Sequence, residues 1–180
     1  MHNFLFKLKS YFLVPLIISG VFVTSNTLSS SMDKVSKHSI RNVPNLEQVK
    51  CLATNIFYEA RKEPLQGQAA VARVVVNRVK HGFGTTPCKV IYQVNYFDKG
   101  NEKPVKVCQF SWVCEGVGKP NERDPNYRKA MQIAYDVYVL DRYKDVVTKN
   151  TLFFHATHVS PDWKYKKVKK IGNHIFYSRS

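Results

Sequence analysis

Acidic residues are scarce in this sequence. Thirteen aspartates and glutamates stand against 28 lysines and arginines, which gives a formal net charge of +15 at pH 7. Such an excess of positive charge indicates a polyanionic partner. Nucleic acid would fit the charge, but no recognisable nucleic-acid-binding module stands out, so we expect no nucleic-acid partner. The densest basic cluster is predicted to be a solvated face; it contains Lys164, Lys166, Lys167, Lys169 and Lys170.

The sequence also lacks the common metal-binding spacings. It contains no Cys-x-x-Cys pair, so a zinc ribbon is not expected. His155, His158 and His174 do not form an HExxH motif, and histidines near strands are more often hydrogen-bonded core residues than ligands. We therefore expect no metal and no cofactor. His155 and His174 are instead candidate substrate-binding residues that orient a substrate or support its groove as neutral side chains.

No apolar run reaches the roughly 20 residues that a membrane-spanning helix needs. Residues 11–23 are apolar, but Pro15 interrupts them; Lys7 and Lys9 precede the run and small residues follow it. This order is typical of a signal peptide. Residues 1–30 are therefore interpreted as a signal peptide or an uncleaved N-terminal anchor in transient contact with the membrane. Export to the periplasm, the cell envelope or the extracellular space is expected.

The rest of the chain suits one domain. Residues 31–45 are polar and are interpreted as a linker, and residues 46–180 show no internal repeat. An apolar fraction of 44% is enough for a core in a chain of this length, and we expect a monomer. Removal of residues 1–30 would leave 26 bases against 13 acids, a net charge of +13. For an exported protein, an anionic cell wall is the predicted partner.

Four cysteines make an even number in a chain that is expected to be exported, which favours two disulfides over free thiols. They are Cys51, Cys88, Cys108 and Cys114. Four cysteines allow three pairings, and the residues themselves do not choose among them. A catalytic cysteine beside His155 or His174 is disfavoured, because an oxidising compartment would convert the thiol to a disulfide.

The most informative stretch places Glu59 and Glu63 around a break between two apolar helices. Apolar residues recur at helical spacing over residues 46–60, and Asn45 with Gln48 would make a capping box. Pro64 fits the first position of the second helix, which is apolar nearly all round and is predicted to be buried.

Glu59 falls in the last turn of the first predicted helix. The negative end of the helix dipole and partial burial both oppose ionisation of its carboxyl group, so its pKa should rise. A raised pKa is what a carboxylic acid needs to donate a proton near neutral pH. A purely structural ion pair with Arg61 or Lys62 is the alternative.

The remainder of the sequence predicts mixed secondary structure. Residues 90–92 and 107–113 are expected to be short strands or extended segments, and Asp124 with Pro125 should start a packing helix. Residues 152–155 and 174–177 are expected to be strands joined by a lysine-rich turn region.

Aromatic faces cover sugar rings while amides and hydroxyls bind sugar hydroxyl groups. A substrate-binding role is therefore assigned to Gln109, Phe110, Ser111 and Trp112, although Phe110 and Trp112 would equally serve as core.

The segment YEARKEPLQGQAAVARVVVNRV resembles the opening signature of the spore-cortex-lytic type of cell wall hydrolase. Members of that family carry Glu-Ala-x-x-Glu-Pro, then Gly-Gln, then an Ala/Val helix that ends in Asn-Arg-Val. Later blocks follow in the family's order, and the likeness spans about residues 48–180. These blocks are CKVIYQ (88–93), QFSWVCEG (109–116), LFFHA (152–156) and IGNHIFY (171–177).

The resemblance implies an α+β, lysozyme-like or lytic-transglycosylase-like domain with a helical core and short β segments. It implies cleavage of peptidoglycan between N-acetylmuramic acid and N-acetylglucosamine, with Glu59 as the general acid/base of a lytic transglycosylase and Glu63 as a weaker catalytic candidate. Because Cys88 and Cys114 lie in family blocks, they are expected to pair, which leaves Cys51 with Cys108. A water-using muramidase, a non-catalytic peptidoglycan-binding protein and an exported basic nuclease remain as alternatives.

Overall fold

The computed structural model of the protein describes residues 45–98, 100 and 103–179. These residues belong to one compact unit, which extends over Arg41–Ser180. The predicted signal peptide or anchor and most of the predicted linker lie outside the described residues. Within the described ranges, no helix has the length and apolarity required to cross a membrane.

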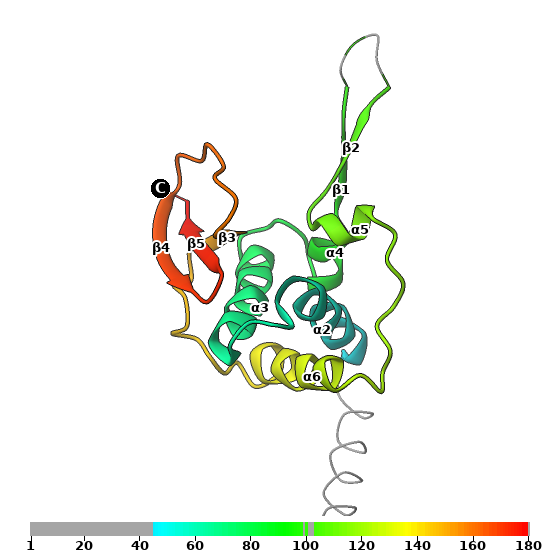
Figure 1. Ribbon diagram of the computed structural model, residues 1–180, viewed down its shortest axis with the longest axis vertical. Coiled ribbons are helices and arrows are strands. Elements are labelled where there is room, and N and C mark those ends of the chain that lie inside the picture. Colours follow the sequence, from blue (N-terminus) through cyan, green and yellow to red (C-terminus); the bar gives the residue numbers. More distant parts are fainter. Residues whose placement is uncertain (1–44, 99, 101–102, 180) are drawn as a thin grey trace, which may run out of the picture. The chain divides into compact units, whose positions relative to one another are not determined.

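Three longer helices pack together in the described part of the chain. Helix α2 (Leu46–Ala60) packs against both α3 (Leu65–Lys80) and α6 (Pro125–Tyr138), as Figure 1 shows. Helix α3 is buried along almost its whole length, as its apolar sequence predicted. Its valines and alanines place apolar side chains on all faces of the helix, so the helix is stable only when other elements surround it. The core around it includes Ala70, Val71, Val74, Val147, Ile171 and Phe176.

The helix starts in the structure agree only in part with the predicted ones. The predicted capping box of α2 does not form, because Asn45 has a positive φ of 67° and makes no side-chain cap. Gln48 instead accepts a hydrogen bond from the backbone N–H of Cys88 at 3.0 Å. Pro64 precedes α3 as its N-cap rather than occupying its first position. At α6 the prediction is confirmed, since the Asp124 carboxylate accepts from the N–H of Asn126.

The middle of the chain contains two short helices where extended segments were expected. Helix α4 (Pro87–Ile91) replaces the predicted strand around residues 90–92. The predicted extended segment 107–113 is a strand only up to Cys108, and α5 (Ser111–Cys114) takes its last three residues. Between them, β1 (Val94–Phe97) and β2 (Val105–Cys108) form an antiparallel hairpin that extends away from the helices in Figure 1. Pro87 and the Thr86 cap favour a helical start at α4, which outweighs the β-branched residues behind them.

A three-stranded antiparallel sheet completes the fold. Strands β3 (Thr151–Ala156) and β5 (His174–Ser178) pair directly and confirm the two predicted strands. The lysine-rich segment between them is not only a turn, because it contains the edge strand β4 (Lys166–Ile171), in the order β3-β5-β4. One side of the sheet packs on α3 through Phe154 and Phe176. The α+β architecture agrees with the predicted class.

The disulfides are Cys51–Cys88 and Cys108–Cys114, with Cα–Cα distances of 5.3 and 5.7 Å. The expectation of two disulfides is confirmed, but the expected pairing of Cys88 with Cys114 and of Cys51 with Cys108 is wrong. Cys88 lies at the start of α4, which packs on α2, so its partner is on α2. Cys114 instead ends the short helix that follows β2 and therefore reaches Cys108.

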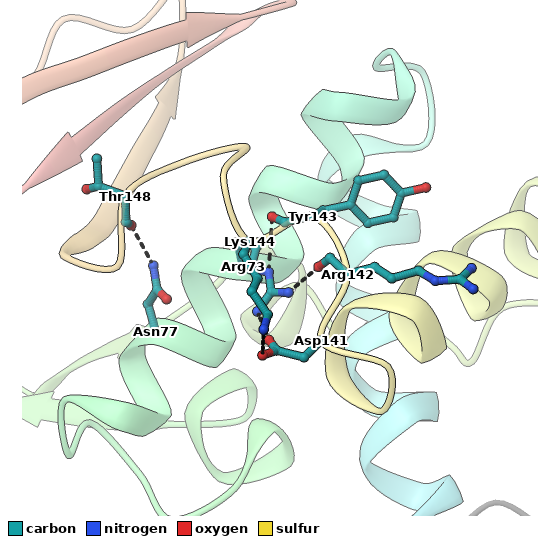
Figure 2. Close-up of polar contacts among 7 residues, drawn as sticks. All are labelled: Arg73, Asn77, Asp141, Arg142, Tyr143, Lys144 and Thr148. Carbon is teal, nitrogen blue, oxygen red and sulfur yellow. Dashed lines mark hydrogen bonds and ion pairs between the residues drawn. The ribbon is translucent and has the colours of Figure 1, made fainter.

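Arg73 of α3 organises the segment after α6. Its guanidinium donates to the Asp141 carboxylate at 2.7 Å and to the backbone carbonyls of Arg142 and Tyr143 (Figure 2). Asp141 and Tyr143 have positive φ values of 51° and 59°, a conformation that residues other than glycine adopt at a cost. The three donated hydrogen bonds offset that cost and fix where the chain leaves α6.

One turn further along α3, Asn77 holds the end of the same segment. Its side-chain amide donates to the carbonyls of Thr148 and Thr151, each at 3.0 Å; Figure 2 shows the first of these bonds. Thr151 begins β3, so a single helix face positions the sheet. The C-terminal turn of α3, which carries Arg78, is thereby held beside β3.

Candidate active site

Glu59 occupies the last turn of α2, where the sequence predicted it. Its side chain is partly buried, and within the described part of the chain no hydrogen bond is made to its carboxyl group. The pKa of Glu59 is raised to about 7: burial raises it, the nearby Arg78 guanidinium opposes that rise, and the Glu115 carboxylate adds to it. A carboxylic acid in this environment is largely protonated below neutral pH and loses its proton near it, as a general acid/base requires.

Arg78 is the positive charge that acts on Glu59. It lies near the C-terminus of α3, with only 4% of its surface exposed, and its Nε donates to the Leu152 carbonyl at 2.7 Å. Burial lowers the pKa of Arg78 to about 10, so the guanidinium remains charged at neutral pH. Its Nη1 atom is buried without a hydrogen-bond partner, which leaves a donor available in a water-poor site.

Three aromatic rings surround the Arg78 guanidinium. Its carbon lies 5.5 Å from the ring centroid of Phe110, 5.7 Å from that of Phe153 and 5.9 Å from that of Phe83. Aromatic faces attract cations, and they also exclude the water that would screen the charge. The field of Arg78 at Glu59 is therefore stronger than that of an exposed arginine.

Trp112 fastens the predicted groove segment to α2. Its indole N–H donates to the Asn55 side-chain oxygen at 3.1 Å, and its ring stacks on Tyr58 with centroids 5.0 Å apart. Asn55 precedes Glu59 by one helical turn, so it lies on the same face of α2. The amide nitrogen of Asn55 is buried with no hydrogen-bond partner. This contact brings α5 beside Glu59 and explains why Glu115, which follows α5, affects its pKa.

The four predicted substrate-binding residues of this segment separate into two pairs. Phe110 and Trp112 are buried, with 5% and 6% of their surfaces exposed. They support the site from within, through Arg78 and Asn55 respectively. Gln109 is partly exposed and Ser111 is exposed, so these two have the access that contact with a substrate requires.

Glu63 has a different environment from Glu59. Its carboxylate accepts from the backbone N–H of Asn173 at 2.8 Å and from the Asn173 side-chain amide at 3.2 Å. Gly172 has a φ of +56°, and a Cβ atom at that position would lie 2.0 Å from Glu63 Oε2. The turn between β4 and β5 therefore closes on Glu63, which ties the start of α3 to the sheet.

His155 and His174 lie on opposite faces of the sheet. Strand pairing places His155 opposite Ile175 and His174 opposite Ala156, and successive residues of a strand point to alternate faces. His155 contacts the Tyr177 hydroxyl through Nε2 at 2.9 Å. His174 is buried against Phe154, and burial lowers the pKa of its imidazole. Among the described side chains, no group of three or more His, Cys, Asp or Glu residues is placed to hold a metal ion.

Sequence reasoning did not single out Arg78, Asn55 and Glu115, which the structure places around Glu59. Arg78 belongs to the Asn-Arg-Val block. An arginine in an otherwise apolar helix could have predicted a nearby acidic partner, since a buried charge needs one. Asn55, one turn before Glu59 on the same face, offered a similar signal. Glu115 carried none, because its approach to Glu59 depends on how α5 docks.

The sequence profile of the Cell Wall Hydrolase family matches residues 62–177. The chain belongs to this family. Among individual proteins, this cell wall hydrolase chain is 28% identical over 142 residues to the spore cortex-lytic enzyme of Bacillus cereus. That match covers 75% of this chain and 47% of the relative, so the chain spans about half the length of the curated relatives it matches.

Solved structures of relatives confirm the fold of this cell wall hydrolase. The catalytic domain of the Bacillus cereus SleB protein matches with a TM-score of 0.50 and covers 76% of this chain and 96% of its own. The catalytic domain of the germination-specific lytic transglycosylase SleB from Bacillus anthracis matches with a TM-score of 0.53, over 76% of this chain and all of its own. Both are 28% identical to the chain. The predicted α+β, lysozyme-like class is thus confirmed.

Proposed function

We propose that this protein cleaves the glycan strands of peptidoglycan between N-acetylmuramic acid and N-acetylglucosamine as a lytic transglycosylase. The observation that carries the proposal is the environment of Glu59, a partly buried carboxyl group at a helix end with a pKa near 7. The described relatives support the reaction class, since one is a germination-specific lytic transglycosylase.

Glu59 is the single general acid/base of the proposed reaction. As an acid it protonates the glycosidic oxygen, and the bond from that oxygen to C1 of the muramic acid breaks. The Glu59 carboxylate then removes the proton of the C6 hydroxyl, whose oxygen bonds to C1 and closes the 1,6-anhydro ring. Arg78 stabilises the carboxylate between the two steps, because its buried guanidinium acts on that group. No water is consumed, and Glu59 ends protonated.

Gln109 and Ser111 are proposed to bind the sugar beside Glu59, with Phe110 and Trp112 supporting them from below. His174 is proposed to support the substrate groove from the inner face of the sheet as a neutral imidazole. Its Nδ1 atom is buried and, among the described residues, has no hydrogen-bond partner. Glu63 is proposed to stabilise the turn of Gly172 and Asn173 rather than to react.

A second mechanism has one observation in its favour. Glu115 is exposed and lies near enough to Glu59 to raise its pKa, so the site contains a second carboxylate. A water-using muramidase places a second carboxylate where it activates water. If water attacks, Glu115 is therefore a better candidate for the base than Glu63.

Export is proposed to precede action on the wall. The two disulfides fit an oxidising compartment. Residues 1–30, as a signal peptide or anchor, would deliver the protein to the periplasm, the cell envelope or the exterior, where it is proposed to act as a monomer.

Mass spectrometry of the soluble fragments released from purified peptidoglycan tests the mechanism. We expect 1,6-anhydro-muropeptides from the full chain and none from its Glu59→Gln variant. Reducing-end muropeptides would instead establish hydrolysis, and their loss in Glu115→Gln would then identify the base. Release of no fragments by the correctly disulfide-bonded chain would leave the non-catalytic wall-binding alternative.

A further inference from the structure

Two rows of side chains cross the face of the sheet that points away from α3. Each row takes one residue from β3, one from β5 and one from the edge strand β4, because paired residues project on the same side. The rows are Phe153, Tyr177 and Lys167, and His155, Ile175 and Lys170. Together these six residues are called the outer sheet face.

Aromatic rings from the β3–β4 connection enlarge this face. Tyr165 stacks on Phe153 with ring centroids 4.2 Å apart and planes 5° apart. Trp163 packs edge-on against Tyr177 at 5.8 Å and against His155 at 5.4 Å, yet 39% of its surface is exposed. The connection thus presents a tryptophan ring that packing between neighbours leaves accessible.

The charge of this region is strongly positive. Residues 151–180 contain six bases and one acid, Asp162. Lys167 and Lys170 are exposed, and within the described ranges neither takes part in a salt bridge. Two unpaired ammonium groups beside partly exposed rings are complementary to a polymer that carries both sugars and carboxylates.

Phe153 links the outer sheet face to the surroundings of the candidate active site. The Phe153 ring lies 5.7 Å from the Arg78 guanidinium, which acts on Glu59. The Phe153 ring also contacts Trp163, with centroids 6.1 Å apart, so a single residue touches both Arg78 and the exposed tryptophan. This proximity favours the same polymer as the occupant of both sites.

We propose that the outer sheet face binds a stretch of the peptidoglycan strand outside the cleaved linkage. Trp163 and Tyr177 contact sugar rings, while Lys167 and Lys170 contact the carboxylates of the peptides attached to muramic acid. The proposal rests on the proposed function for its choice of polymer. It also gives a role to part of the lysine cluster that the sequence suggested was only a solvated face.

Co-sedimentation of the full chain with peptidoglycan sacculi stripped of accessory anionic polymers tests this surface. All proteins carry Glu59→Gln, so that the strands are not cut during the measurement. We expect Lys167→Gln/Lys170→Gln to bind roughly tenfold more weakly at low salt, and added salt to reduce the difference. Trp163→Ala should also bind roughly tenfold more weakly, with little change on adding salt.

Two matched controls make the result specific. Lys129→Gln/Lys149→Gln removes two exposed lysines elsewhere, and Tyr96→Ala removes a ring of the β1–β2 hairpin that is 68% exposed. Both should bind as the parent does, with unchanged thermal unfolding. Equal weakening by the lysine control would show an effect of net charge alone and overturn the proposal. A larger effect of Tyr96→Ala than of Trp163→Ala would move the contact to the hairpin and also overturn it.

Further outcomes separate this proposal from the proposed function. If the chain binds only to walls that retain accessory anionic polymers, those polymers are the ligand of the outer sheet face and the proposal is wrong. If the active chain releases no fragments while the sheet variants still lose binding, the proposed function fails and the surface stands. If fragments are released and the sheet variants bind like the parent, the surface fails alone.

Discussion

The last turn of α2 and the turn that follows it each carry a glutamate, and the two side chains have opposite surroundings. Glu59 is withdrawn from water, faces the negative charge of Glu115, and receives no hydrogen bond from the described residues. Glu63 receives two hydrogen bonds from Asn173 and closes a turn. Two carboxylates four residues apart can therefore serve reactivity and structure separately, because the fold supplies donors to one and removes water from the other.

Replacement of each glutamate by glutamine is the strongest test of this contrast. Glu59→Gln should lower the rate of fragment release by about 10³-fold, because no proton reaches the leaving oxygen. Glu63→Gln should change the rate by less than about threefold but cost about 1 kcal/mol of unfolding free energy, since its hydrogen bonds weaken. Release rates and urea unfolding of both variants measure these effects.

A matched substitution checks the structural half of the contrast. Gly172→Ala forces a Cβ atom onto the Glu63 carboxylate and should destabilise the protein while Glu59 stays unaffected. The contrast would be wrong if well-folded Glu63→Gln lost as much activity as Glu59→Gln.

Removal of the Arg78 charge should show how far Glu59 depends on its neighbour. In Arg78→Met, Glu59 loses the positive charge that lowers its pKa, so its pKa should rise above the parent's value of about 7. The fall in rate at high pH, where protonated Glu59 is lost, should shift upward by about one pH unit.

The maximal rate of Arg78→Met should also fall by about tenfold, since the intermediate carboxylate is less stabilised. Arg78→Lys keeps the positive charge, so the pH at which its rate falls should return at least partly toward that of the parent. If the rate of a folded Arg78→Met protein falls at the same pH as that of the parent, Arg78 has only a packing role. A pH–rate profile for the parent and both variants decides the point.

The contrast also predicts how the stability of the protein depends on pH. Glu59 has a pKa of about 7 in the folded protein against 4.5 ordinarily, so the folded state holds its proton more tightly than the unfolded state. The resulting stabilisation is complete below pH 4.5 and is lost as the pH rises through 7. At pH 8 the ionised Glu59 should therefore cost about 2 kcal/mol, after allowance for its partial exposure.

Urea unfolding of Glu59→Gln and of the parent at pH 5 and pH 8 measures this cost. The variant should be the more stable of the two at pH 8, and its advantage should shrink at pH 5. An advantage that does not change between the two pH values would show that Glu59 titrates as an ordinary carboxyl group.

The sequence predicted the features that depend on neighbours along the chain. The helix break, the position of Glu59 at a helix end and the buried character of α3 follow from periodicity and from Pro64. Features set by contacts distant in sequence were beyond it. Asn173, the partner of Glu63, lies 110 residues away, and the docking of α5 beside Glu59 depends on a bond between Asn55 and Trp112.

Strand β4 shows a second reason for failure. Its sequence KKVKKI carries lysines on both faces, so it lacks the alternation of apolar and polar residues that marks a half-buried strand. An edge strand tolerates such charge, and charge there discourages pairing with other chains. The pairing of the cysteines failed for a related reason, because it depends on α4 lying against α2 and on α5 turning back to β2.

The Cys51–Cys88 disulfide joins residues 37 apart, and the loop that it closes contains Glu59, Glu63, α3 and Arg78. In the chain-entropy treatment, a loop of this size stabilises the folded state by about 4 kcal/mol. That contribution exists only where thiols are oxidised. A chain in a reducing compartment therefore lacks it, and the helices that carry Glu59 reach full stability only where the disulfide forms. The crosslink thus makes the stability of the helices around Glu59 depend on the redox state of the compartment that holds the protein.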